Sequence, residues 1–167
     1  MLPVVNVRLP QALRGLKNGQ LPDEVLHPIR PNGRLFITAA TSWQWMKKAA
    51  RMEANLLLRP TSPFDAYRPL TVQTAVFHQR YVSERIPGAP TRVCNGKTYW
   101  LKPGNAPLAC PGTSNHGWGL AIDVANVTKA LPWLLERAPA FGWSWEVQSE
   151  PWHIRYVLGD ELPKVAA

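Results

Sequence analysis

The stretch "TSNHGWGLAIDVAN", residues 113–126, contains a strand-like run with an acidic residue inside it. Apolar residues alternate from Leu120 to Val124, so they would face the core, while Asp123 would face the opposite side of the strand. A carboxylate on a largely buried strand is costly unless its charge is compensated, and a metal ion compensates it fully. His116, just before the strand, offers a second metal-binding side chain.

A later stretch, "SEPWHIRY", offers the remaining groups of a catalytic metal site. Strand alternation places His153 on the face opposite its apolar neighbours, and Glu150 stands at the entrance of this strand. Catalytic zinc takes three nitrogen and oxygen ligands from the protein and keeps a fourth position for water. His116, Asp123 and His153 match that count, and Glu150 is the candidate general base.

Taken together, these residues form the pattern S-x-H-x-x-G-x-A-x-D followed by E-x-x-H. This pattern resembles that of the zinc D-alanyl-D-alanine carboxypeptidases and the L-alanyl-D-glutamate endopeptidases of bacteriophage lysins. The resemblance extends over roughly residues 40 to 158 and implies an α+β fold, with a central antiparallel sheet flanked by helices as in hedgehog and lysostaphin-type domains. The seven matching positions are Ser114, His116, Gly119, Ala121, Asp123, Glu150 and His153.

In that family the two histidines and the aspartate bind Zn2+ and the glutamate is the general base. The resemblance therefore implies zinc on His116, Asp123 and His153, with Glu150 as the base. The "AYRP" stretch is similar to a family segment whose arginine approaches the substrate, which nominates Arg68 as a catalytic and substrate-binding residue.

Some of these positions have a structural alternative to a functional role. Pro69 departs from the family segment, and Arg68 could instead form a surface ion pair with Asp65. Gln73 also resembles a family position near the site. The substrate-binding candidates are Arg68, Gln73, Ser114, Trp118 and Trp152; of these, Ser114 could instead hold the turn that presents His116.

Length and charge narrow the class of protein. A chain of 167 residues is long enough for one domain with a real core. The net charge of +8 favours an anionic partner, but the basic residues are scattered and form no nucleic-acid-binding run. We therefore expect no nucleic-acid partner, and an acidic cell-wall polymer, bacterial peptidoglycan, fits the charge. A solvated basic surface without a partner is the alternative.

The hydropathy pattern shows no membrane span and no leader. No apolar run reaches 18 residues, and the start, "MLPVVNVRLPQALRG", lacks a basic leader followed by a long apolar segment. We therefore expect no membrane insertion. Separately, we expect the protein to be a monomer. The absent leader favours a phage endolysin, made in the host cytoplasm and acting on the wall after release.

The pattern of helices and strands predicts an extended, proline-rich arm over residues 1–37 and one peptidase domain over residues 38–167. A long irregular loop, residues 86–113, leads into the opening motif. Cys94 and Cys110 flank its turn-rich part, and they could form a disulfide or remain free thiols. The first helix is expected to begin at Thr38 or at Ser42 and to run to Leu57, and further helices are expected over residues 71–85 and 128–138. Strands are expected over residues 55–59, 119–125, 143–147 and 152–158.

A non-catalytic zinc-binding adhesion or signalling module of the same fold is the alternative function. Glu150 argues against it, because a purely structural metal site needs no spare carboxylate and prefers four protein ligands. The sequence thus favours a zinc peptidase acting on the stem peptide of peptidoglycan, without deciding which bond is cut.

Overall fold

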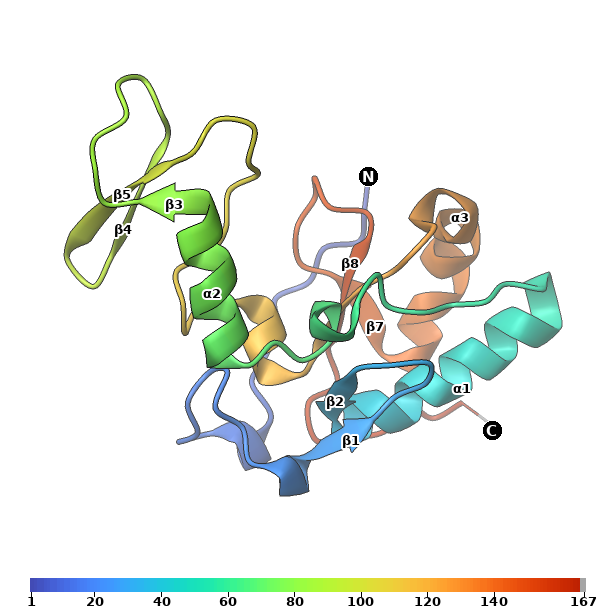
Figure 1. Cartoon of the computed structure of the whole chain (residues 1–167). Helices are drawn as coiled ribbons and strands as arrows, with labels where there is room; N and C mark the ends of the chain where they lie inside the picture. Colours follow the sequence, from blue (N-terminus) through green and yellow to red (C-terminus); the bar gives the residue numbers. More distant parts are fainter. Residues whose placement is uncertain (166–167) are drawn as a thin grey trace.

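A computed structural model describes residues 1–165 and shows a central antiparallel sheet of three short strands. Its order is β6 (Ala121–Asp123), β8 (His153–Tyr156) and β7 (Trp143–Trp145). Nearly all of their side chains are buried, including the polar and charged ones, Ser144, His153 and Arg155. The α+β architecture predicted from the sequence is confirmed (Figure 1). Residues 166 and 167, the end of the predicted peptidase domain, lie outside the described residues.

Two helices cover this sheet. Helix α1 (Ile37–Ala54) begins next to the earlier of the two predicted starts, Thr38, and ends at Asn55, whose left-handed backbone breaks the helix. It buries Trp43 against the sheet, where its ring meets the ring of Trp143 edge-on at a centroid distance of 5.7 Å. Helix α3 (Val127–Arg137) matches its predicted position within one residue and continues into a 3-10 turn, Ala138–Phe141.

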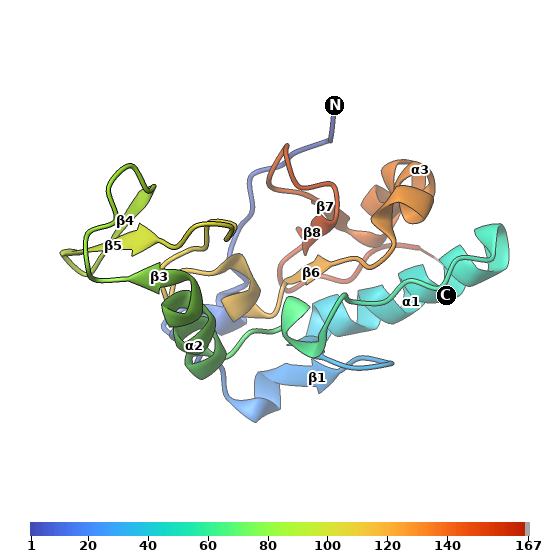
Figure 2. The ribbon, with the colours of Figure 1, turned by 45° about the horizontal axis from the view of Figure 1, so that its top comes forward.

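The N-terminal arm is part of the main core. It contains two single-turn 3-10 helices, Gln11–Leu13 and Asp23–Val25, and then a hairpin of β1 (Leu26–Pro28) and β2 (Arg34–Phe36). Figures 1 and 2 show this hairpin alongside α1. Apolar side chains along the arm are almost fully buried, and removing the arm would therefore open the core. They include Leu13, Leu21, Leu26, Ile29 and Leu35.

The predicted strand over residues 55–59 is wrong. Leu56 and Leu58 are buried and Leu57 is exposed, as in a strand. Within the described part of the chain, however, this segment has no ladder partner, and the one isolated bridge beside it joins Pro60, the next residue, to Val124. Alternating burial therefore does not make a ladder without a continuous partner. A 3-10 turn, Pro63–Asp65, follows this extended segment.

Residues 81–113 form an insert that stands to one side of the body in both ribbon views (Figures 1 and 2). It follows helix α2 (Leu70–Arg80), which is shorter than predicted because its expected last turn is β3 (Tyr81–Val82). The region expected to be irregular contains a hairpin of β4 (Thr91–Cys94) and β5 (Lys97–Leu101), and the sheet order is β3-β5-β4.

The insert has its own small core and a covalent closure. Phe77 at the end of α2 stacks on Tyr81 with ring centroids 4.5 Å apart. Cys94 and Cys110 form a disulfide that joins the hairpin to the returning chain. Within residues 1–165, none of the helices is long and apolar enough to span a bilayer.

Candidate metal and catalytic site

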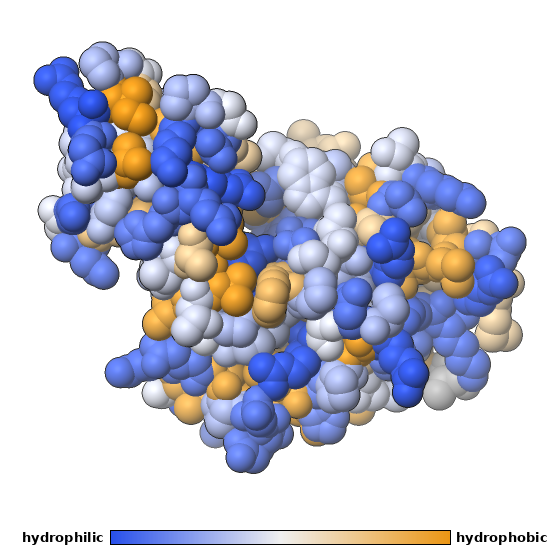
Figure 3. All heavy atoms as spheres, in the orientation of Figure 1, coloured by the Kyte–Doolittle hydropathy of each residue, from blue (hydrophilic) through white to orange (hydrophobic). Residues whose placement is uncertain are grey.

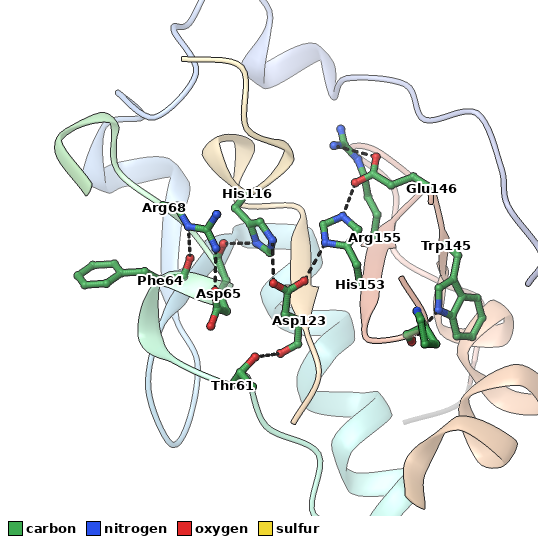
Figure 4. A network of polar contacts seen from close by, with 12 residues as sticks. Thr61, Phe64, Asp65, Arg68, His116, Asp123, Trp145, Glu146, His153 and Arg155 are labelled. Atoms are coloured by element: carbon green, nitrogen blue, oxygen red, sulfur yellow. Dashed lines mark hydrogen bonds and ion pairs between the residues drawn. The ribbon is translucent and has the colours of Figure 1, made fainter. Parts of the chain in front are cut away.

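Three side chains from different elements meet at the edge of the central sheet. His116 comes from the 3-10 turn Asn115–Trp118, Asp123 ends β6 and His153 begins β8. Asp123 and His153 are directly opposite in the ladder, so the register of two strands brings them together. The ligand atoms of the three residues lie within 4.8 Å of one another (Figure 4).

The two shortest contacts within this cluster both involve Asp123. His116 Nε2 lies 3.3 Å from Asp123 Oδ2, and His153 Nδ1 lies 2.8 Å from Asp123 Oδ1. A tetrahedral zinc with ligand bonds of about 2.0 to 2.1 Å has ligand atoms about 3.3 Å apart. The distance between His116 and Asp123 equals this spacing, and His153 and Asp123 lie slightly closer, at hydrogen-bond distance.

The outer nitrogen of each histidine already has an acceptor. His116 Nδ1 lies 3.1 Å from the carbonyl oxygen of Ala66, which can only accept, so this nitrogen carries the proton. His153 Nε2 lies 2.6 Å from Glu146 Oε1. When each ring donates outward, both inner nitrogens turn a lone pair toward the Asp123 carboxylate. Acceptors facing one another in this way require a positive charge between them, either a metal ion or a proton.

The electrostatics of the metal-free cluster agree with this requirement. Burial raises the pKa of Asp123, but its contacts with His116 and His153 outweigh this effect and hold the pKa well below its usual range. Burial lowers the pKa of His153, yet the hydrogen bonds to Asp123 and Glu146 raise it to about 9. Without a metal, a proton on His153 thus takes the place that the geometry offers to a cation.

Glu146 is a site residue that the sequence reasoning missed. It follows β7, and its carboxylate contacts His153 on one side and Arg155 on the other, where Arg155 Nη1 lies 3.4 Å from Oε2. Burial raises the pKa of Glu146, but the hydrogen bond from His153 and the charge of Arg155 lower it overall. The only available signal was the alternation of side chains between the two faces of the strands "WSWEV" and "HIRY". It places Glu146 on the same face of the paired strands as His153 and Arg155.

A cleft of about 540 Å³ opens in front of the cluster and is lined by several of the predicted residues. Glu150 lies in the turn before His153, and no hydrogen bond or ion pair engages its carboxylate among residues 1–165. Ser114 and Trp152 also line the cleft, and Trp152 is 41% exposed. The cleft therefore combines the metal-ligand cluster with an unengaged carboxylate.

Arg68 lines the same cleft and is also held in place. Its Nη2 lies 2.7 Å from Asp65 Oδ1, and its Nε donates to the carbonyl oxygen of Phe64 at 3.0 Å (Figure 4). The ion pair considered as an alternative is thus present, but it leaves Arg68 at the wall of the cleft. Both roles predicted for this residue agree with its position.

Gln73 and Trp118 lie outside the lining of the cleft. Gln73 is buried; its amide nitrogen donates to the carbonyl oxygen of Arg68 at 2.9 Å, and its oxygen accepts from the backbone of Gly112. This places Gln73 behind the wall, where it supports Arg68. Trp118 is half-buried and lies near Glu146 in a separate depression.

The N-terminal arm fixes the turn that carries His116. Asn18 Nδ2 donates to the carbonyl oxygen of Ser114 at 2.8 Å, and the amide of Gly19 donates to the carbonyl oxygen of Gly117. A Cβ on Gly117 would lie 2.0 Å from the side chain of Asn18, so only glycine allows this close approach. The turn is therefore shaped by a segment almost 100 residues earlier.

Comparison with known proteins gives a family for most of the chain. The model of the VanY family, D-alanyl-D-alanine carboxypeptidase, matches residues 33–159. This range contains the metal-ligand cluster, Glu150 and the insert. Among curated protein sequences, none matches this chain.

Two solved structures share the fold. One is a variant of the vancomycin resistance D,D-pentapeptidase VanY in complex with Zn(II), with 21% identity, a TM-score of 0.53 and 82% of each chain covered. The other is VanYB in complex with D-alanine-D-alanine, with 22% identity, a TM-score of 0.53, and 79% of this chain and 76% of that chain covered. At this level of identity, both similarities describe the fold.

Proposed function

Because the chain belongs to the VanY family of D-alanyl-D-alanine carboxypeptidases, we propose that it is a zinc peptidase that cleaves the stem peptide of bacterial peptidoglycan. One observation carries this proposal. Two histidines with engaged outer nitrogens direct their inner nitrogens at a carboxylate, next to a cleft that contains a further carboxylate without a partner. The solved VanY complex with Zn(II) supports the choice of metal.

The residues that would hold zinc are His116 through Nε2, Asp123 through its carboxylate and His153 through Nδ1. The donor set of two nitrogens and one oxygen is typical of catalytic zinc, which keeps a position open for water. Bound there, zinc would supply Lewis acidity and lower the pKa of a water molecule toward neutrality. Glu146 would keep His153 in the tautomer that the site requires.

Glu150 is the residue proposed to move protons. It lies in the cleft beside the ligand cluster, and its carboxylate is free to accept a proton from the attacking water and donate it to the leaving amine. Arg68, held by Asp65, presents a guanidinium to the cleft, where it would pair with a substrate carboxylate or with the oxyanion that develops on attack.

The choice of bond is part of the proposal. The family and the complex of VanYB with D-alanine-D-alanine favour the terminal D-alanyl-D-alanine bond over an internal L-alanyl-D-glutamate bond. A role in lysis of a host cell wall by a phage remains a prediction, which the net charge of +8 supports through attraction to an anionic wall.

The substitution Glu150→Gln tests the mechanism, because it keeps the shape of the side chain and removes its ability to accept a proton. We expect turnover of a peptide ending in D-alanyl-D-alanine to fall roughly 10²- to 10⁴-fold while one equivalent of zinc is retained. Glu136→Gln, an exposed change on α3, is the matched control. Wild-type turnover by the Glu150 variant would exclude Glu150 as the general base, whereas a lack of turnover by the zinc-bound unmodified protein would favour the non-catalytic binding module.

A further inference from the structure

The far end of the cleft has a wall that the catalytic proposal does not use. Successive turns of α2 contribute Val72, Val76 and Arg80, each four residues apart and therefore on one face of the helix. The chain returning from the insert to the body lies opposite and adds Leu108. Figure 3 shows the hollow between the insert and the body of the molecule. This part of the cleft is apolar along its length and ends in a cation.

Arg80 differs from the other arginine of the cleft. The charge of Arg68 is balanced by Asp65 at 2.7 Å, whereas no carboxylate lies within 4.0 Å of the guanidinium of Arg80 among residues 1–165. Arg80 Nη1 donates to the carbonyl oxygen of Ala106 at 3.1 Å, which anchors the side chain to the insert without neutralising it. Its remaining donors are available to a ligand.

At the opposite end of the cleft the charges are mostly paired, since Asp65 contacts Arg68 and Asp123 lies between His116 and His153. Arg80, whose charge has no such partner among residues 1–165, can therefore attract a negatively charged side chain of a bound peptide at its own end of the cleft. The nine residues from Val72 to Arg80 span about 12 Å of helix, which corresponds to three or four residues of an extended peptide. Between the ends, Val72, Val76 and Leu108 can contact the aliphatic part of a side chain.

We propose that Arg80, with the apolar strip of Val72, Val76 and Leu108, forms a subsite for an acidic side chain of the bound peptide, a few residues from the bond that is cleaved. This inference rests on the proposed function and names the kind of substrate preferred. A peptide with a carboxylate-bearing side chain at that position is preferred over peptides with a neutral amide or an amine there.

The test uses synthetic peptides that end in D-alanyl-D-alanine. Each peptide carries glutamate, glutamine or lysine at a single upstream position, and each upstream position is tested in turn. Binding is measured by calorimetry and cleavage by kcat/KM, on the unmodified protein and on Arg80→Gln. Glutamine keeps a donor for the Ala106 carbonyl and removes the charge. Arg85→Gln, an exposed arginine in the insert that does not line the cleft, is the control.

We expect a preference of about tenfold for the carboxylate peptide at one position, the size of a single partly exposed charge-assisted pair. Arg80→Gln should abolish this preference by raising Kd and KM for the carboxylate peptide, with those for the amide peptide unchanged. Arg85→Gln should preserve the preference. Equal losses on the acidic and amide peptides, or no preference in the unmodified protein, would overturn the subsite. An Arg80-dependent binding preference without any cleavage would support the subsite and overturn only the proposed peptidase function.

Discussion

Substitution of Glu146 by alanine should weaken zinc binding without touching a ligand. The carboxylate accepts from His153 Nε2 at 2.6 Å, and the His153 side chain is only 5% exposed, so water cannot readily replace the lost acceptor. A buried hydrogen bond to a charged group contributes about 1.5 to 3 kcal/mol. If the metal-bound protein loses this free energy, the zinc dissociation constant rises roughly 10- to 150-fold.

Competition with a chromophoric chelator measures this constant directly. Glu146→Gln should have a smaller effect, less than about tenfold, because the amide oxygen still accepts from His153 while the charge that faces Arg155 is lost. Glu136→Gln on α3 should leave zinc affinity unchanged. A folded Glu146→Ala protein whose zinc dissociation constant is within about threefold of the unmodified value would contradict this reasoning. It would show that the contact between Glu146 and His153 Nε2 does not help to hold His153 as a zinc ligand.

Three further predictions follow from the site and the insert. Chelation should lower the Tm by roughly 8 to 16 °C, because a metal present at a thousand times its Kd adds about 4 kcal/mol to the free energy of unfolding. The Tm of His116→Ala should not change on chelation. Arg68→Ala should reduce kcat/KM with zinc content intact, and a loss of folding instead of activity would assign Arg68 to the ion pair alone. Replacing both Cys94 and Cys110 by serine should remove about 3 kcal/mol from the local stability of the insert, so amide exchange should accelerate there; unchanged protection would contradict a stabilising disulfide.

The ligand cluster could be predicted from the sequence because it depends on local rules. Strand alternation sets the side of the sheet on which Asp123 and His153 lie, and antiparallel pairing of two neighbouring strands brings them together. The short turn with two glycines delivers His116 to the same edge. Each step requires only a few residues and a known geometry.

Features that depend on distant partners could not be predicted in the same way. Asn18 holds the His116 turn from the N-terminal arm, and nothing in the arm's composition indicates that contact. The hairpin of the insert was signalled only by its Asn-Gly turn, since Val93 is exposed and the strands lack a clear apolar face. Conversely, buried and exposed side chains alternate over residues 55–59 as they do in a strand, but this segment lacks a neighbouring strand to form a ladder within the described chain.

Two glutamates precede His153 within seven residues, and their surroundings assign them opposite roles. Both oxygens of Glu146 are engaged, by His153 and by Arg155, so this carboxylate can orient a ring but cannot readily exchange protons with a substrate. Glu150 lines the cleft, and no such contact engages it within the described chain.

The two positions should therefore respond differently to the same chemical change. Glu150→Gln should lower turnover and leave zinc affinity intact, whereas alanine at Glu146 should lower zinc affinity and restore most turnover when excess zinc fills the site. Turnover measured across a zinc titration separates the two effects. A Glu146→Ala variant that stays inactive at saturating zinc would mean that Glu146 takes part in the reaction itself, and the division of roles between the two carboxylates would be wrong.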